Sequence, residues 1–134
     1  MLYYQTIQPD TLELLKRLMA EPLFEGTRLV GGTALALQFG HRSSIDIDLF
    51  GTIEEDTDLT TEVLNSIGPT VPGKCTPRIK SYRVNGIKTD FVRYDCYPWI
   101  DDAIIEDGLR LASPKDIAAM KMNAIQGRGT RKDF

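Results

Sequence analysis

Apolar and polar residues recur along the chain with two periods, one typical of helices and one typical of strands. Apolar residues three or four positions apart, bounded by capping residues, Pro or Gly, predict helices over 10–21, 33–39, 57–67 and 113–126. Alternation with period two predicts strands over 28–30, 45–50, 78–84 and 87–94, and a short edge strand over 109–111. Residues 97–105 fit neither pattern clearly.

Capping residues mark the start of two of these helices. Thr57 or Asp58 is the expected cap of the third helix. Ser113 is the expected cap of the fourth, because Pro114 follows at the first helical position and Asp116 lies three residues after the cap. Both helices therefore have a defined beginning in the sequence.

The connections between the strands predict the fold class. Asn85-Gly86 joins two predicted strands and is the strongest short-range indication of a hairpin. The other strands are separated by helices, and such crossovers join parallel strands. The sequence therefore predicts one α/β (α+β) domain over residues 1–134, with helices packed on a mixed sheet that includes the 78–94 hairpin.

Composition narrows the class of protein. With 134 residues, 42% hydrophobic and 26% charged, the chain has the balance of one soluble globular domain. One His and two Cys without a CxxC pair exclude a His-rich zinc site, a zinc ribbon and a disulfide scaffold. The chain has no apolar run of the roughly 18 residues that span a membrane, and its start lacks the features of a signal peptide. We therefore expect a cytoplasmic protein without a membrane partner.

Charge limits the way in which the chain contacts nucleic acid. The net charge of −3 excludes a basic field over the whole surface. Only the C-terminal segment 115–132 is locally basic. It is suited to RNA phosphate contacts, and the alternative is a solvated helix face.

Three aspartates interrupt strands that are otherwise apolar. Asp46 and Asp48 are two positions apart, so their carboxylates lie on the same face of the predicted strand. Asp is a poor strand former, and neighbouring carboxylates repel unless a divalent cation such as Mg²⁺ or Mn²⁺ neutralises them. Asp90 lies within a later predicted strand. If the two strands are neighbours, we expect the three carboxyl groups within about 6 Å, the reach of a shared metal pair; the alternative for the Asp46–Asp48 pair is a solvated strand face.

A glycine turn precedes the acidic strand. Gly31-Gly32 ends one predicted strand and begins a helix, and Thr33 adds a hydroxyl. Glycines let the backbone approach a ligand closely, and the first N–H groups of a helix form an anion site. A plain tight turn is the alternative explanation, and the order of the glycine turn and the Asp-x-Asp pair favours a ligand site.

The run from Leu29 to Phe50, LVGGTALALQFGHRSSIDIDLF, resembles the nucleotidyltransferase superfamily that includes DNA polymerase beta. It is more closely similar to the AbiEii/AbiGii toxin family of minimal nucleotidyltransferases. In that pattern a Gly-Gly or Gly-Ser pair precedes Asp-x-Asp, and a third Asp, here Asp90, lies on a later strand. The segments 113–121 and 128–134 resemble later stretches of the family. The resemblance covers residues 25–134 and implies a core domain that lacks the family's C-terminal helical region.

The resemblance implies a role for each matching residue. Asp46, Asp48 and Asp90 would bind metal, with Asp90 alternatively acting as general base on the attacking hydroxyl. Lys121 would neutralise charge on the leaving pyrophosphate, unless it is only the polar side of a helix. The nucleotide-binding residues would be Gly31, Gly32, Thr33, Arg42, Lys132 and Asp133. For Arg42 an ion pair with the acidic strand is the alternative.

The function implied is metal-dependent transfer of a nucleoside monophosphate from an NTP to an acceptor hydroxyl, with Mg²⁺ or Mn²⁺ as cofactor. The family suggests the 3′ end of tRNA or another RNA as acceptor, and a toxin-antitoxin system with a cognate antitoxin protein. One alternative is a non-catalytic descendant that binds a nucleotide or a partner. Another is a nucleotidyltransferase that acts on a small molecule. Three costly strand carboxylates favour catalysis, because an inactive copy has no reason to keep them.

Overall fold

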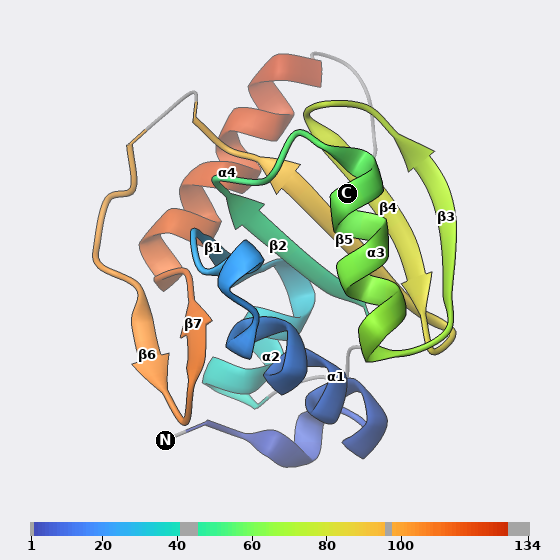
Figure 1. The fold of residues 1–134 in the computed structure, drawn as a ribbon. Helices are drawn as coiled ribbons and strands as arrows, with labels where there is room; N and C mark the ends of the chain where they lie inside the picture. Colours follow the sequence, from blue (N-terminus) through green and yellow to red (C-terminus); the bar gives the residue numbers. More distant parts are fainter. Residues whose placement is uncertain (1, 41–45, 96–97, 129–134) are drawn as a thin grey trace.

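The structure, a computed structural model, describes residues 2–40, 46–95 and 98–128, except for the side chains of residues 121 and 123–128. Its helices are α1 (Pro9–Ala20), α2 (Gly31–Phe39), α3 (Thr57–Ile67) and α4 (Pro114–Arg128), with short 3₁₀ turns η1 (Tyr4–Thr6) and η2 (Pro22–Phe24). Its strands are β1 (Thr27–Val30), β2 (Ile47–Gly51), β3 (Thr70–Cys75), β4 (Ile79–Val84), β5 (Ile87–Arg93), β6 (Ile104–Glu106) and β7 (Leu109–Leu111) (Figure 1). Across these described ranges, no helix is both long and apolar enough to cross a membrane.

The strands form one sheet in the order β3-β4-β5-β2-β1-β7-β6. The pairs β2–β5 and β1–β7 are parallel, and the other neighbours are antiparallel. The predicted hairpin is confirmed: Asn85 and Gly86 have φ of 53° and 79° between β4 and β5, as a type I′ turn requires. The mixed sheet confirms the predicted fold class, and its central β2–β5 pair brings the two acidic strands together.

One face of the sheet is packed under α3 and the segment that follows α1 (Figure 1). Tyr82 of β4 has its hydroxyl 3.0 Å from that of Thr61 in α3. Phe24 of η2 stacks on Phe91 of β5, with ring centroids 4.6 Å apart. Alternate residues of β2, β4 and β5 are buried on this side because strand side chains alternate between the faces. This face contains most of the hydrophobic core.

Among the described residues, the cover of the opposite face is α4, which lies at the β1–β7 side (Figure 1). Ser113 caps α4 as predicted, and its hydroxyl accepts a hydrogen bond of 3.1 Å from the Asp116 backbone N–H. The Asp116 carboxylate accepts hydrogen bonds from the N–H groups of Ile100 and Asp101 at 2.7 and 3.2 Å. Burial opposes ionisation of Asp116, but these bonds and one from Ser113 outweigh it and hold its pKa below its ordinary value.

Several helix boundaries differ from the prediction: α1 covers Pro9–Ala20 and not 10–21, and α2 begins at Gly31 and not at Thr33. Asp56, not Thr57 or Asp58, caps α3: its Oδ1 accepts hydrogen bonds from the N–H groups of Asp58 and Leu59 at 2.9 and 3.2 Å. A cap residue has extended backbone, and Asp56 has it, with φ of −73° and ψ of 103°. The fourth helix also continues past the predicted end at about Gln126, through Gly127 to Arg128.

Two strands at the ends of the sheet also differ. The segment Leu109–Leu111 was expected at an edge and instead lies between β1 and β6. A second hairpin explains this position: Asp107 and Gly108, with φ of 53° and 81°, turn β6 back on β7. The edge strand β3 was not predicted, because it contains Pro72-Gly73. An edge tolerates Pro, since its N–H position faces away from the ladder.

A fully buried lysine fixes the segment between β2 and α3. Lys80 of β4 is 0% exposed, and its Nζ donates to the Glu55 carbonyl at 3.0 Å, the Thr57 hydroxyl at 2.8 Å and the Thr76 carbonyl at 3.4 Å. The three acceptors match the three ammonium protons, which makes burial of this charge tolerable. Lys80 therefore has a structural role: its hydrogen bonds connect β4 to the segment before α3.

Candidate active site

The register of the central strands places two of the predicted aspartates side by side. In the parallel pair β2–β5, Asp48 lies opposite Asp90. Residues in register on neighbouring strands have their side chains on the same face, which here is the face opposite the main core. Asp46, two residues before Asp48, precedes the start of β2 and is half-buried. The structure therefore joins residues from two distant parts of the chain into one acidic site.

The ionisation of Asp48 shows how closely these groups interact. Burial raises the pKa of the Asp48 carboxyl, and the charges of Asp90 and Asp46 raise it further, to about 6. The ammonium of Lys88 acts in the opposite direction. A carboxyl that is buried among other carboxyls is costly to ionise, and a cation would remove that cost.

Asp90 has a buried oxygen without a hydrogen bond. Its Oδ1 is inaccessible to solvent and receives no hydrogen bond from any described residue. Its Oδ2 lies 3.6 Å from Nζ of Lys88, a half-exposed lysine two residues earlier on the same strand. Buried polar atoms are normally paired, so an orphaned carboxylate oxygen indicates a position for a cation or a proton donor.

The glycine turn lies directly beside Asp48. Val30 of β1 is in register with Asp48, so the next residue, Gly31, begins α2 next to that carboxylate. Gly31 has φ of +76°, and a Cβ there would lie only 2.8 Å from the Asp48 Oδ2. Both the left-handed backbone and the close approach require glycine. The turn is therefore part of the acidic site and not only a connection.

Thr33 and Gly32 occupy the first turn of α2. Thr33 is fully buried, and its hydroxyl donates a hydrogen bond to the backbone carbonyl of Asp46. This bond ties the start of α2 to the residue that precedes β2. Gly32 is only half-buried, which leaves its backbone N–H as the better candidate for contact with a phosphate.

The donor set fits a divalent cation of the Mg²⁺ class. Asp48 and Asp90 offer carboxylate oxygens on the same face, one of them unpaired, and hard oxygen ligands are what Mg²⁺ and Mn²⁺ prefer. Within the described residues, no three His, Cys, Asp or Glu side chains are grouped closely enough to hold one metal ion. Asp46, Asp48 and Asp90 are all among these residues, so the structure does not group them as the predicted three-carboxylate cluster. It places Asp48 beside Asp90, and metal binding by these carboxylates stays a prediction.

The other predicted residues are only partly placed. Lys121 lies on α4, on the same side of the sheet as the carboxylates, but its side chain is outside the described part. Arg42, Lys132 and Asp133 lie outside the described residues altogether. Sequence reasoning missed Lys88, although its spacing of two from Asp90 places both side chains on one strand face.

Aromatic side chains pack beside the site, on the same face of the sheet as Asp48. The Tyr94 ring lies 5.0 Å from that of Trp99 and 6.0 Å from that of Phe50, between ring centroids. The guanidinium of Arg28 lies 4.3 Å from the centre of the Trp99 ring, within the range of a cation–π contact. These contacts identify Tyr94 and Trp99 as packing residues.

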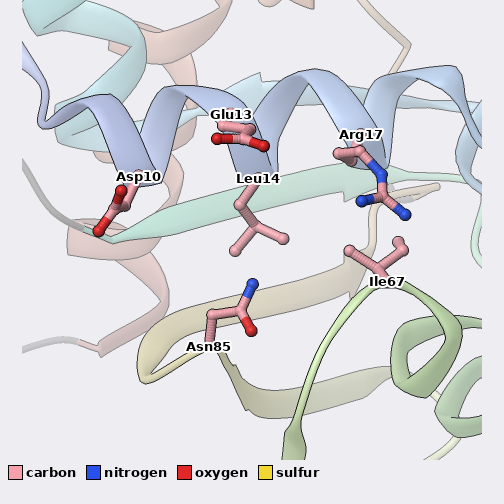
Figure 2. Close-up of a pocket in the computed structure, with 6 residues that line it drawn as sticks. All are labelled: Asp10, Glu13, Leu14, Arg17, Ile67 and Asn85. Carbon is pink, nitrogen blue, oxygen red and sulfur yellow. The ribbon is translucent and has the colours of Figure 1, made fainter.

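A separate cavity of about 230 Å³ lies between α1 and the β4–β5 turn (Figure 2). It is lined by Asp10, Glu13, Leu14, Arg17, Ile67 and Asn85. None of the predicted site residues lines it, so this cavity and the acidic site are distinct.

Comparison with known proteins identifies a family over the part of the chain that contains the glycine turn and the aspartates. Residues 13–134 match the family described as nucleotidyl transferase AbiEii toxin, type IV TA system. The chain belongs to this family. The resemblance that the glycine turn and the aspartates indicated is thereby confirmed. A relative from Aquifex aeolicus (strain VF5), the uncharacterized protein aq_aa25, is 31% identical over 133 residues. The match covers 96% of this chain and 64% of the relative, so the chain spans less than two thirds of that protein.

Solved structures share the fold of this family member. JHP933 from Helicobacter pylori has a TM-score of 0.61 and 22% identity, over 93% of this chain and 62% of that one. TM1012 from Thermotoga maritima has a TM-score of 0.56 and 18% identity, over 92% and 91% of the two chains. ANT(2″)-Ia, solved with adenylyl-2″-tobramycin, has a TM-score of 0.58 and 15% identity, over 90% and 78%. At these identities the likeness concerns the fold.

Proposed function

We propose that this AbiEii-family chain transfers a nucleoside monophosphate from an NTP to an acceptor hydroxyl with the help of a divalent cation. The observation that supports the proposal most directly is the register of Asp48 with Asp90, next to Gly31. Both the left-handed backbone at Gly31 and its close approach to Asp48 require glycine. Membership of a nucleotidyltransferase family supports the same chemistry. Mg²⁺ or Mn²⁺ held by these carboxylates would neutralise charge on the transferred phosphoryl group.

The chain's own residues have distinct tasks in this proposal. Asp48 and Asp90 would hold the cation, and Asp46 would add negative charge beside them. The backbone N–H groups at Gly31-Gly32 would bind phosphate oxygens. The acceptor oxygen forms a bond to the α-phosphorus as the bond to the leaving pyrophosphate breaks, and the hydroxyl proton passes to a carboxylate such as Asp90. Lys121 of α4 neutralises the pyrophosphate.

The acceptor and the biological setting belong to the same proposal. The family description, a toxin of a type IV TA system, supports an antitoxin encoded with this protein. An RNA acceptor such as the 3′ end of tRNA fits a toxin that acts in the cytoplasm. A small-molecule acceptor is the second candidate, because the likeness of fold extends to ANT(2″)-Ia, which was solved with an adenylylated aminoglycoside.

The experiment is a label-transfer assay with each α-³²P NTP and Mg²⁺, offered total tRNA or an aminoglycoside. We expect label in one acceptor with wild type and a loss of at least a hundredfold with Asp48→Asn or Asp90→Asn, as for removal of a metal ligand. Asp102→Asn, a change at an exposed carboxylate, is the matched control and should keep wild-type activity. Full activity of Asp48→Asn, or nucleotide binding with no transfer to any acceptor, would contradict the catalytic proposal.

A further inference from the structure

A pair of basic side chains lies on the face that contains Asp48 and Asp90, on the half that no described helix covers. Arg83 of β4 is directly opposite Lys88 of β5 in the antiparallel ladder, so the two side chains are on the same face. Lys88 and Asp90 are two residues apart on β5, and their ion pair confirms that they share this face. Arg83 and Lys88 are both exposed. A basic pair thus begins immediately beside the proposed catalytic carboxylates.

Two like charges directly opposite each other weaken a sheet. The chain has a net charge of −3, so this pairing does not follow from an excess of basic residues. Asp90 offsets only part of the repulsion, because its Oδ2 is 3.6 Å from Nζ of Lys88, and the Arg83 side chain makes a long hydrogen bond of 3.4 Å to the Gly86 carbonyl. An anion between Arg83 and Lys88 would remove the repulsion and use their remaining donors.

The surface beside this pair is hollow. A depression of about 250 Å³ extends from Arg83 and Lys88 to the edge strand β3. Gly73 and Ser81 line this depression, and their small side chains leave its space open. A Cβ on Gly73 would lie 3.1 Å from the Ser81 carbonyl, so β3 and β4 are close together there. Val71, in register with Arg83, is 66% exposed at its border. Cationic and apolar groups therefore line one open groove.

We propose that this groove, between Arg83, Lys88 and Val71, binds the sugar-phosphate backbone of a nucleic-acid acceptor next to its attacking hydroxyl. Arg and Lys contact phosphates, and the exposed Val71 offers apolar surface to a sugar or base. The groove is open toward the sheet edge, as an extended polymer requires. The proposal rests on the proposed nucleotidyl transfer, because it assigns the acceptor of that same site.

Binding of a fluorescein-labelled single-stranded RNA, followed by anisotropy in EDTA, tests the groove without chemistry. Arg83→Gln/Lys88→Gln is the test variant, and Lys16→Gln/Arg17→Gln is the control that removes two exposed charges from α1. We expect the test variant to bind at least tenfold more weakly, and its slope of log affinity against log salt to fall by about 1.4, at roughly 0.7 per phosphate contact on a single strand. The single variant Arg83→Gln, which keeps the Lys88–Asp90 ion pair, should show about half of that change in slope.

Two outcomes would overturn the proposal. Equal losses in the test and control variants would show that only overall charge matters. Binding of polyglutamate with the same dependence on Arg83 and Lys88 would indicate an acidic protein partner instead. Asp48→Asn separates this groove from catalysis: if it transfers no nucleotide but still binds RNA through Arg83 and Lys88, the groove stands whatever the chemistry. Thermal unfolding of each variant confirms that it is folded.

Discussion

Replacing Asp48 by Asn should make the protein more stable while it destroys the site. The wild-type carboxyl is buried beside Asp90 and Asp46, and these neighbours together with burial raise its pKa to about 6. At neutral pH the folded protein therefore holds a charge that the unfolded chain holds at lower cost. Asn keeps the shape of the side chain and removes the charge.

The magnitude follows from the two pKa values. A rise from 3.8 to about 6 in the folded protein corresponds to about 3 kcal/mol, at roughly 1.4 kcal/mol for each tenfold change in the ionisation equilibrium. Partial contact of Asp48 with solvent reduces this, so we expect a gain of about 1–3 kcal/mol for Asp48→Asn. Because the folded pKa is the higher one, the penalty is complete above pH 6 and disappears as the pH falls toward 3.8.

Urea unfolding of wild type and Asp48→Asn between pH 4 and pH 8 measures this difference in the absence of divalent cations. The two unfolding free energies should be similar near pH 4 and separate as the pH rises through 6. Asp102→Asn, at an exposed position, should follow wild type within about 0.5 kcal/mol. A variant that is less stable than wild type at pH 7.5, or a gap that does not change with pH, would refute the electrostatic argument.

Four further predictions concern the same framework. Mn²⁺ should raise the melting temperature of wild type and leave that of Asp48→Asn nearly unchanged in a thermal scan, and equal shifts would place the metal elsewhere. Gly31→Ala should cost about 1–3 kcal/mol in urea unfolding, because it combines a left-handed backbone with a Cβ 2.8 Å from the Asp48 Oδ2. Asp116→Asn should cost about 1–3 kcal/mol at pH 7, and its effect should shrink at acid pH, because a lowered pKa contributes stability that is lost as the carboxylate protonates. Lys80→Met should destabilise by about 1–3 kcal/mol and speed proteolysis before α3, and unchanged rates of both unfolding and cleavage would show that its three hydrogen bonds contribute little.

Local rules in the sequence predicted most of the central part of the fold. Asn85-Gly86 has the φ angles that its turn requires, and Gly40 ends α2 in the left-handed conformation, because few residues other than Gly and Asn adopt these angles at low cost. The edge strand β3 escaped prediction because its pairing with β4, and not its own composition, makes Pro72-Gly73 extended. The cap of α3 was missed by one residue because Asp56, Thr57 and Asp58 are all suitable cap types.

The residue types of the candidate site could be predicted from the sequence, but their arrangement in space could not. The spacing of Asp46 and Asp48 predicted side chains on one strand face, but the strand begins at Ile47 and not at residue 45, so Asp46 lies outside it. No local rule states that β2 and β5 are neighbours. The sequence left this pairing as a condition, and the register of Asp48 with Asp90 now shows it. Lys88 was overlooked because a lysine on a strand usually only faces solvent. Its place in the site is recognised only from its ion pair with Asp90.

The parallel pairing of β2 with β5 also sets the order in which the protein becomes complete. Asp48 and Asp90 belong to strands separated in the chain by α3, β3 and β4, so their meeting depends on closure of a long loop. Contacts of this kind form slowly compared with helices and hairpins. A nascent chain that has emerged only as far as β4 has no Asp90, so it cannot assemble the carboxylate pair. The carboxylate pair can therefore exist only in chains that have been synthesised past β5.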